Sequence, residues 1–195
     1  VDLIEAAISD RTKAIMPVWF TGNAPDMEKI VSIANKHNLL IVEDSCTAIN
    51  ATYKNKHAGS FGIAGAFSFH PLKNLNVWSD GGMITTDADQ LNEQLRMLRN
   101  YGLRSRDEVE VFGYNSRLDT LQSVVALRLI DDVKFYTDRR IKIAETYDKA
   151  FAQMPQIEAP ERHGHVRHVF HLYMLRVKDR DKLLQYCIER GVEAK

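Results

Sequence analysis

The run Leu39–Val42 places the strongest constraint on the fold. It has four consecutive apolar residues, too few for a helix, and two carboxylates, Glu43 and Asp44, follow it at once. A continuous apolar strand is typical of a parallel sheet that is covered on both faces. The stretch Lys13–Phe20 predicts a second buried strand, and the helical spacing of apolar residues in Met27–His37 predicts a helix between the two. This order predicts a right-handed crossover in an α/β fold.

The two carboxylates lie where such a fold would bind a ligand. In open α/β sheets, ligands bind outside the carboxyl ends of the strands, so Glu43 and Asp44 are expected at that edge. Asp44 has two interpretations. It could cap a helix formed by the residues that follow it, or its carboxylate could hydrogen-bond a protonated pyridine nitrogen and keep that ring electron-withdrawing.

A lysine is expected on a loop just after another strand. The apolar run Ala64–Phe69 stops at His70-Pro71, and because proline cannot donate to a sheet ladder, the strand should end there and deliver Lys73 onto a loop. Surrounding apolar side chains would partly desolvate the amine, which lowers the pKa of a lysine and makes it a better nucleophile. The alternative is an ordinary surface lysine beside a core strand. The apolar side chains in question are Phe67, Phe69, Leu72, Leu75 and Trp78.

The rest of the chain continues the α/β pattern. Its organisation predicts part of a large domain over residues 1–135, followed by a linker helix and the start of a smaller α/β domain over residues 136–195. The expected elements are a strand at Met83–Thr86, a helix at Ala88–Asn100, a long helix from Leu118 to about Ala152 with a bend near Asp131-Asp132, a strand at His168–Val177 and a helix at Asp179–Arg190.

Composition excludes several classes of function. The chain has 26 basic residues (Lys and Arg) and 26 acidic residues (Asp and Glu), so no overall charge favours nucleic acid or an anionic membrane. Cys46 and Cys187 lie too far apart for a metal motif and suit a reducing cytosol, and no apolar run approaches the length of a spanning helix. We therefore expect a soluble cytoplasmic protein. Because the sequence starts at Val1 without methionine, we expect a fragment of a longer protein.

Histidines cluster near the C-terminal end of the chain. Four of the seven, His163, His165, His168 and His171, fall close together in sequence. A strand directs alternate residues to opposite faces, so His168 and His171 should point apart, and no acidic or cysteine partner shares their pattern. We therefore predict no metal site.

Three motifs, in order, resemble one known family. They are Glu43-Asp44, the stretch Ser68-Phe-His-Pro-Leu-Lys-Asn74 followed by Asp80-Gly-Gly82, and Gly113-Tyr-Asn-Ser-Arg-Leu-Asp119. This set resembles the DegT/DnrJ/EryC1/StrS family, the sugar aminotransferases that use pyridoxal 5'-phosphate (PLP). The resemblance implies the fold type I architecture, with a three-layer α/β/α large domain around a mostly parallel sheet. It also implies a homodimer with shared active sites.

The resemblance also implies roles for particular residues. Lys73 would bind PLP as a Schiff base and act as general acid and base, and Asp44 would hold the pyridine nitrogen. Ser68 would bind the cofactor phosphate, and Asn115 the phosphate of the partner subunit's cofactor. Asn115 and Ser116 can also cap the long helix that follows. His171 is a weak candidate for a substrate contact.

One position departs from the family pattern. Three residues after the aspartate, family members usually carry Gln or His near the ring oxygen of the cofactor, whereas this chain has the shorter Thr47. Thr47 is retained as a candidate cofactor ligand, directly or through water. The small-residue loop that supplies most phosphate donors in the family lies upstream of Val1.

Two functions follow from the resemblance. The first is an aminotransferase that moves an amino group, typically from glutamate, onto a nucleotide-linked keto sugar. Lys73 favours transamination, because the dehydratase branch of the family has histidine there. The alternative is a truncated or catalytically silent homologue that acts as a dimerisation or interaction module, although such a homologue is expected to have lost Lys73 or Asp44.

Overall fold

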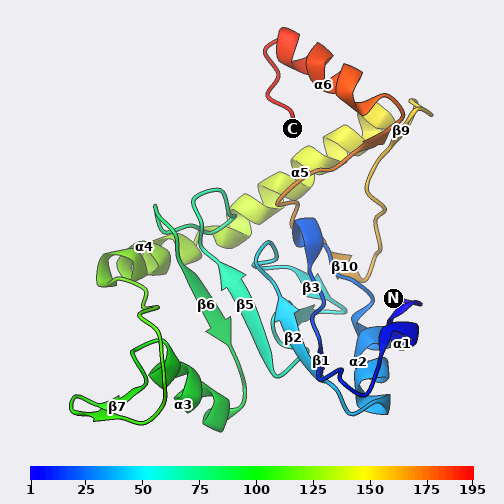
Figure 1. The fold of residues 1–195 in the computed structure, drawn as a ribbon. Coiled ribbons are helices and arrows are strands. Elements are labelled where there is room, and N and C mark those ends of the chain that lie inside the picture. Colours follow the sequence, from blue (N-terminus) through cyan, green and yellow to red (C-terminus); the bar gives the residue numbers. More distant parts are fainter.

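The computed structural model describes residues 1–195 and centres on a four-stranded sheet (Figure 1). The strand order is β1-β2-β5-β6; β1, β2 and β5 are parallel, and β6 runs antiparallel to β5. This confirms the parallel core predicted from the apolar runs and the strand predicted at Met83–Thr86, which pairs antiparallel to β5. The four strands are β1 (Ala14–Ile15), β2 (Leu40–Asp44), β5 (Ala64–Ser68) and β6 (Gly82–Thr85).

The first strand is much shorter than predicted. The expected strand Lys13–Phe20 is wrong over most of its length, because β1 ends at Ile15 and Pro17 follows, which has no N–H for a ladder. The chain then makes a single parallel bridge from Val18 to Asp44 and enters the 3-10 turn η1 (Phe20–Gly22).

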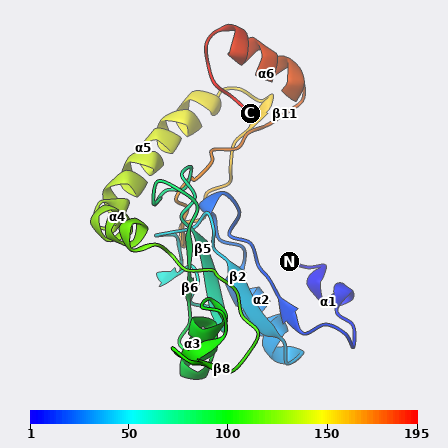
Figure 2. The same ribbon diagram turned by 60° about the vertical axis from the view of Figure 1, so that its left-hand side comes forward.

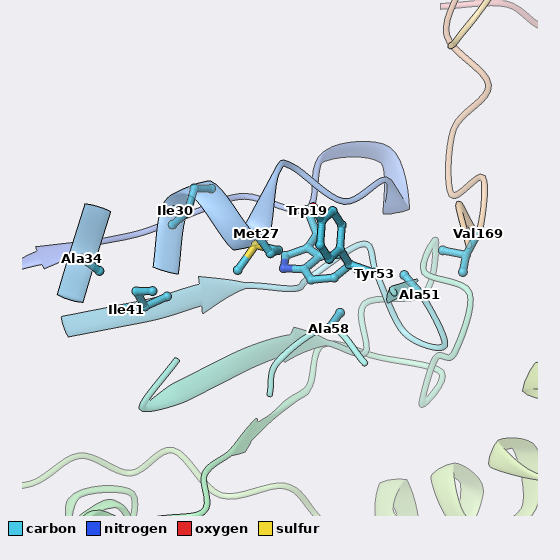
Figure 3. Packing of buried hydrophobic residues seen from close by; sticks show 10 residues of the cluster. Trp19, Met27, Ile30, Ala34, Ile41, Ala51, Tyr53, Ala58 and Val169 are labelled. Atoms are coloured by element: carbon cyan, nitrogen blue, oxygen red, sulfur yellow. The ribbon is translucent and has the colours of Figure 1, made fainter. Parts of the chain in front are cut away.

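The helix between the first two strands forms as predicted. Helix α2 (Met27–Lys36) begins after Asp26, whose carboxylate accepts the backbone N–H of Lys29 at 3.1 Å. Its buried face packs on the sheet, and Figure 3 shows this packing around Trp19. The buried cluster consists of Trp19, Met27, Ile30, Ala34, Ile41, Ala48, Ala51, Tyr53, Ala58 and Val169.

Glu43 is built into this core. The residue is fully buried, and its carboxylate accepts from the Trp19 indole at 2.9 Å. The backbone N–H groups of Gly59, Phe61 and Gly62 also donate to it, at 2.9, 2.5 and 3.0 Å. Gly59 sits at φ +78°, and a Cβ there would lie 2.6 Å from the Phe67 ring. Glu43 therefore fastens the loop before β5 to β2.

Replacing Glu43 with alanine should destabilise the protein strongly, since four donors, two buried and two partly buried, would lose their acceptor. We expect a loss of about 3–5 kcal/mol in the free energy of unfolding, measured by urea denaturation of the full-length protein. Glu43→Gln should also destabilise, because its amide NH₂ would face N–H donors. The exposed control Glu108→Ala should leave stability within about 0.5 kcal/mol. A Glu43→Ala protein as stable as this control would refute the fastening role.

The remaining strands are short. The predicted strand His168–Val177 is wrong: only its last two residues form one, because the backbone turns at Phe170, which has φ +47°. Val169 packs in the core of the main sheet, so residues from the predicted second domain contribute to the first. The short strands form one three-stranded sheet and two two-stranded sheets. The three-stranded sheet has the order β10 (Val166–Arg167), β3 (Thr52–Tyr53), β4 (Lys56–His57). The two-stranded sheets pair β11 (Arg176–Val177) with β9 (Ile157–Glu158) and β7 (Leu103–Ser105) with β8 (Glu108–Val109).

The long helical pattern divides into two helices where a bend was predicted. Asp131 and Asp132 separate these two helices. The first of them is capped at its N-terminus by Asp119, which forms a capping box with Gln122, so the cap predicted at Asn115 and Ser116 is wrong. In Figures 1 and 2, α5 leads away from the sheet and α6 lies beyond its far end. The other helices are α1 (Ile4–Ala7), α3 (Asp89–Leu98), α4 (Thr120–Ile130), α5 (Val133–Phe151) and α6 (Arg180–Glu189). None of the helices combines the length and apolar character needed to cross a bilayer.

Candidate active site

Asp44 stands at the carboxyl end of β2, as predicted. It pairs with Ala66 of the neighbouring parallel strand β5, and the backbone N–H of Ser45 donates to the Ala66 carbonyl at 2.9 Å. One oxygen of the Asp44 carboxylate, Oδ1, accepts the backbone N–H of Cys46 at 3.1 Å. The other oxygen accepts no N–H or O–H donor within the chain. Asp44 caps no helix, so a carboxylate oxygen remains for a ligand.

Lys73 lies on the loop after β5, also as predicted. Its backbone N–H donates to the His70 carbonyl at 2.8 Å, and the side chain is half-buried, with no ion pair or hydrogen bond to its amine within the chain. The loop is anchored by Phe69 and Leu75, which are buried. The predicted apolar enclosure is wrong for Leu72 and Trp78, which are 71% and 78% exposed, because the loop folds back on β5 and turns them outward.

Cys46 links these two charged groups. Burial raises the pKa of the Cys46 thiol to about 11; the Asp44 carboxylate adds to this shift, and the positive charge of Lys73 opposes it. The thiol therefore lies within electrostatic reach of both side chains. Because it stays protonated at neutral pH, Cys46 is a neutral neighbour of the site rather than a nucleophile.

Ser68 and Thr47 differ in how their hydroxyls are used. Ser68 ends β5 and accepts the backbone N–H of His70 at 3.3 Å, which leaves its hydroxyl proton for a ligand. The Thr47 hydroxyl instead donates to the Trp19 carbonyl at 2.7 Å. The predicted contact of Thr47 with a cofactor oxygen stays a prediction, and donation to that oxygen would require the Trp19 bond to break.

His171 faces the same site from the distant end of the chain. Its backbone N–H donates to the Thr21 carbonyl at 2.9 Å. Burial, together with the positive charges of Lys73 and Arg140, lowers the pKa of His171 to about 4. The imidazole is therefore neutral at physiological pH and lies near Lys73.

Asn115 is not brought to the other candidates within one chain. It is exposed and forms a single antiparallel bridge with Asn100, just after α3. Its neighbours Tyr114 and Ser116 donate backbone N–H groups to Leu98 and Arg99. The segment is thus attached to α3, which Figures 1 and 2 show near the end of the sheet away from α5.

Four polar atoms in residues at or near the candidates in sequence are buried without a hydrogen-bond partner: Ser45 Oγ, Asn50 Nδ2, Asn74 Oδ1 and His171 Nδ1. Of these four residues, only His171 was a predicted candidate. Asn74 was inside the quoted motif, and Asn50 takes a left-handed backbone with φ +64°. The sequence signal that could have identified Ser45 and Asn74 is their position directly after Asp44 and Lys73. Unpaired buried polar atoms are uncommon, so their concentration here favours a polar ligand.

The other three histidines of the cluster lie in a different region. His163 stacks on His165, and His168 Nε2 lies 3.2 Å from the Thr21 hydroxyl. No group of three or more His, Cys, Asp or Glu side chains has a metal-binding arrangement. A hollow of about 230 Å³ beside residues 161–168 lies apart from Lys73. Both arginines that line it are already paired, Arg162 with Asp148 and Arg167 with Asp138.

The geometry can now be set beside known proteins. The sequence model of the DegT/DnrJ/EryC1/StrS aminotransferase family matches residues 1–195. The chain belongs to this family. The α/β fold with its mostly parallel sheet is therefore the fold type I arrangement that the motifs predicted, and the family match covers the candidate residues Asp44, Ser68 and Lys73.

Individual relatives share the fold over nearly the whole chain. A pleiotropic regulatory protein of Geobacillus stearothermophilus is 38% identical, over 97% of this chain and 51% of its own length. The dTDP-3-amino-3,4,6-trideoxy-alpha-D-glucose transaminase of Streptomyces venezuelae is 38% identical, over 98% of this chain and 50% of its own. The crystal structure of S. venezuelae DesV in complex with a ketimine intermediate superposes with a TM-score of 0.95, at 38% identity and over 98% and 52% of the two chains. The chain spans about half the length of the curated relatives it matches.

Proposed function

We propose that the full-length protein is a PLP-dependent aminotransferase that moves an amino group from glutamate onto a nucleotide-linked keto sugar. The observation that carries the proposal is the placement of an unpaired Asp44 carboxylate oxygen and an unpaired Lys73 amine at the same end of β2 and β5, with Cys46 near both. Family membership supports the same reading. The sugar class is supported by the S. venezuelae relative, which is a dTDP-sugar transaminase by name.

The residues of the site suit this cofactor. When bound, PLP supplies an aldehyde that receives the amino group and a ring that withdraws electrons. Asp44 offers a carboxylate oxygen to a protonated ring nitrogen, Lys73 offers the amine for covalent attachment, and Ser68 offers a hydroxyl to phosphate. The unpaired buried atoms of Ser45, Asn74 and His171, which lie beside or among the candidate residues, support a polar ligand here.

Lys73 has a second task in this proposal. In its free form, the Lys73 amine would take a proton from the substrate carbon as a general base and give it back to the reacting group as a general acid. The neutral His171 near it would contact substrate, not compete for that proton.

Both cysteines are free, which supports a cytoplasmic location.

We further propose a homodimer with shared sites. Helix α4 exposes a row of large apolar side chains, which an aqueous surface rarely tolerates as a patch. The exposed Asn115 precedes this helix, so a second copy covering α4 would bring Asn115 near the partner's site. The exposed side chains are Leu121, Val124, Leu127 and Ile130.

Mixing two inactive full-length variants tests enzyme and dimer together. Lys73→Ala and Asn115→Phe are each expected to lack glutamate-dependent amination of a nucleotide-linked keto sugar, followed as 2-oxoglutarate release. In the heterodimer one site carries both defects and the other neither, so activity should return in up to half of its sites.

If Asn115 acted within its own subunit, each heterodimer site would carry one defect and mixing would restore nothing. That result, with heterodimers verified by two affinity tags, would overturn the shared-site model. If the wild-type protein released no 2-oxoglutarate, that result would instead refute the proposed aminotransferase activity.

An interaction module is the second candidate. The exposed apolar face of α4 and the regulatory name of the Geobacillus relative favour it. Retention of both Asp44 and Lys73 at one sheet edge favours the enzyme, because a binding module has no need of either group.

A further inference from the structure

The segment Val169–His171 is fastened to the turn beside the candidate site. The backbone N–H of Val169 donates to the Gly22 carbonyl at 3.0 Å, and that of His171 to the Thr21 carbonyl at 2.9 Å. The side-chain amide of Asn74, the residue after Lys73, donates to the Val169 carbonyl at 3.3 Å. The segment therefore contacts the lysine loop directly, although about a hundred residues separate them.

Arg140 of α5 holds the other side of this segment. Its Nη1 donates to the Phe170 carbonyl at 3.1 Å and to the His171 carbonyl at 3.5 Å. Phe170 has φ +47°, a left-handed conformation that aromatic residues rarely adopt. This turn directs two successive carbonyls toward one guanidinium. A planar, permanently charged donor group suits such a pair of acceptors better than a lysine amine does.

The turn determines where His171 lies. Phe170 is buried and stacks on His168 with ring centroids 3.7 Å apart, so its ring packs with His168. The next residue, His171, is turned toward the site, where the charges of Lys73 and Arg140 both act on it. Its Nδ1 is buried and unpartnered. No acidic side chain acts on this imidazole.

We propose that Arg140 is a positioning residue, which holds Val169–His171 against the lysine loop and thereby fixes the His171 imidazole beside Lys73. The proposal rests on the proposed role of Lys73 and adds to it a support that comes from α5. Arg140 contacts no substrate or cofactor in this account; it holds the segment through the two carbonyls, and its charge also acts on the His171 imidazole.

A neighbouring arginine offers a matched control. Arg167 also ties this region to α5, through an ion pair with Asp138 at 2.7 Å, but donates to neither the Phe170 nor the His171 carbonyl. Arg167→Met therefore removes a fastening of the same kind and leaves the Phe170 turn in place.

Two readouts on the full-length protein separate positioning from general loosening. The first is the pKa of His171, from NMR titration of the histidine Cε1–H signals, assigned with His171→Gln. Arg140→Met should raise this pKa by about one unit or more, because a nearby positive charge is lost and the imidazole becomes more hydrated. Arg167→Met should leave the value close to wild type.

The second readout is the rate at which added PLP is trapped on Lys73 by borohydride. Both Arg140→Met and Arg140→Lys should slow it about tenfold or more through misplacement of the loop. Arg140→Lys keeps the charge, so it should raise the pKa of His171 only through hydration of the displaced imidazole, by less than Arg140→Met does. It also serves as the test if Arg140→Met fails to fold. Unchanged trapping in Arg140→Lys, or an equal pKa shift in Arg167→Met, would overturn the proposal. Absence of any adduct in the wild type would refute the proposed function alone, because the titration still tests the positioning.

Discussion

Replacing Lys73 with alanine should lower aminotransferase turnover by at least about a thousandfold. Two contributions are lost together, the covalent attachment of the cofactor and the general acid–base group. The structure places the amine on a loop anchored by Phe69 and Leu75, with no ion pair that would hold it elsewhere. Turnover is measured as 2-oxoglutarate released by the full-length protein with PLP, glutamate and a nucleotide-linked keto sugar.

Lys73→Arg is the matched control for charge. Arginine keeps the positive charge beside Cys46 and His171 but cannot form the carbon–nitrogen bond, so it should be as inactive as the alanine variant. The exposed Lys178→Ala should retain wild-type turnover. Substantial turnover in Lys73→Arg would mean that the lysine contributes only charge, and the proposed chemistry would then be wrong.

Asp44→Asn should lower turnover by about a hundredfold to a thousandfold. The neutral amide still accepts the Cys46 N–H, so the end of β2 should keep its shape. It cannot, however, stabilise a proton on the ring nitrogen, and the ring then withdraws electrons less strongly. Covalent attachment at Lys73 should persist, because the amine itself is unchanged.

A readout independent of activity accompanies this variant. The negative charge of Asp44 raises the pKa of the Cys46 thiol, so in the protein without cofactor Asp44→Asn should lower that pKa, measured from the pH dependence of alkylation. Alkylation at Cys187 in the same sample provides the internal control. Turnover equal to wild type, with the lower thiol pKa observed, would remove Asp44 from the mechanism.

Local sequence signals predicted where the main residues of the candidate site lie in the fold. Asp44 and Lys73 were predicted because each follows an apolar run with a clear end, and the ends of strands depend mainly on nearby residues. The same kind of signal was available at Pro17, which shortens β1, and it outweighs the apolar character of Lys13–Phe20.

The missed features depend on contacts between distant parts of the chain. Glu43 looked like a second ligand, but the indole of Trp19 and three N–H groups of a later loop occupy its carboxylate. The hydroxyl of Thr47 likewise reaches Trp19. The Phe170 turn ends the strand predicted around it, and its partner Arg140 lies 30 residues earlier on a helix. No spacing within the sequence indicates such pairs.

The identity of the cofactor-binding lysine is tested most directly by chemical trapping. Full-length protein is incubated with PLP, reduced with borohydride, digested and mapped by mass spectrometry, with Lys73→Arg as the control. The account predicts one pyridoxyl adduct in the wild type, on Lys73, and none at that position in the variant. An adduct on a different lysine, or the absence of any adduct, would contradict the central claim that this loop carries the cofactor.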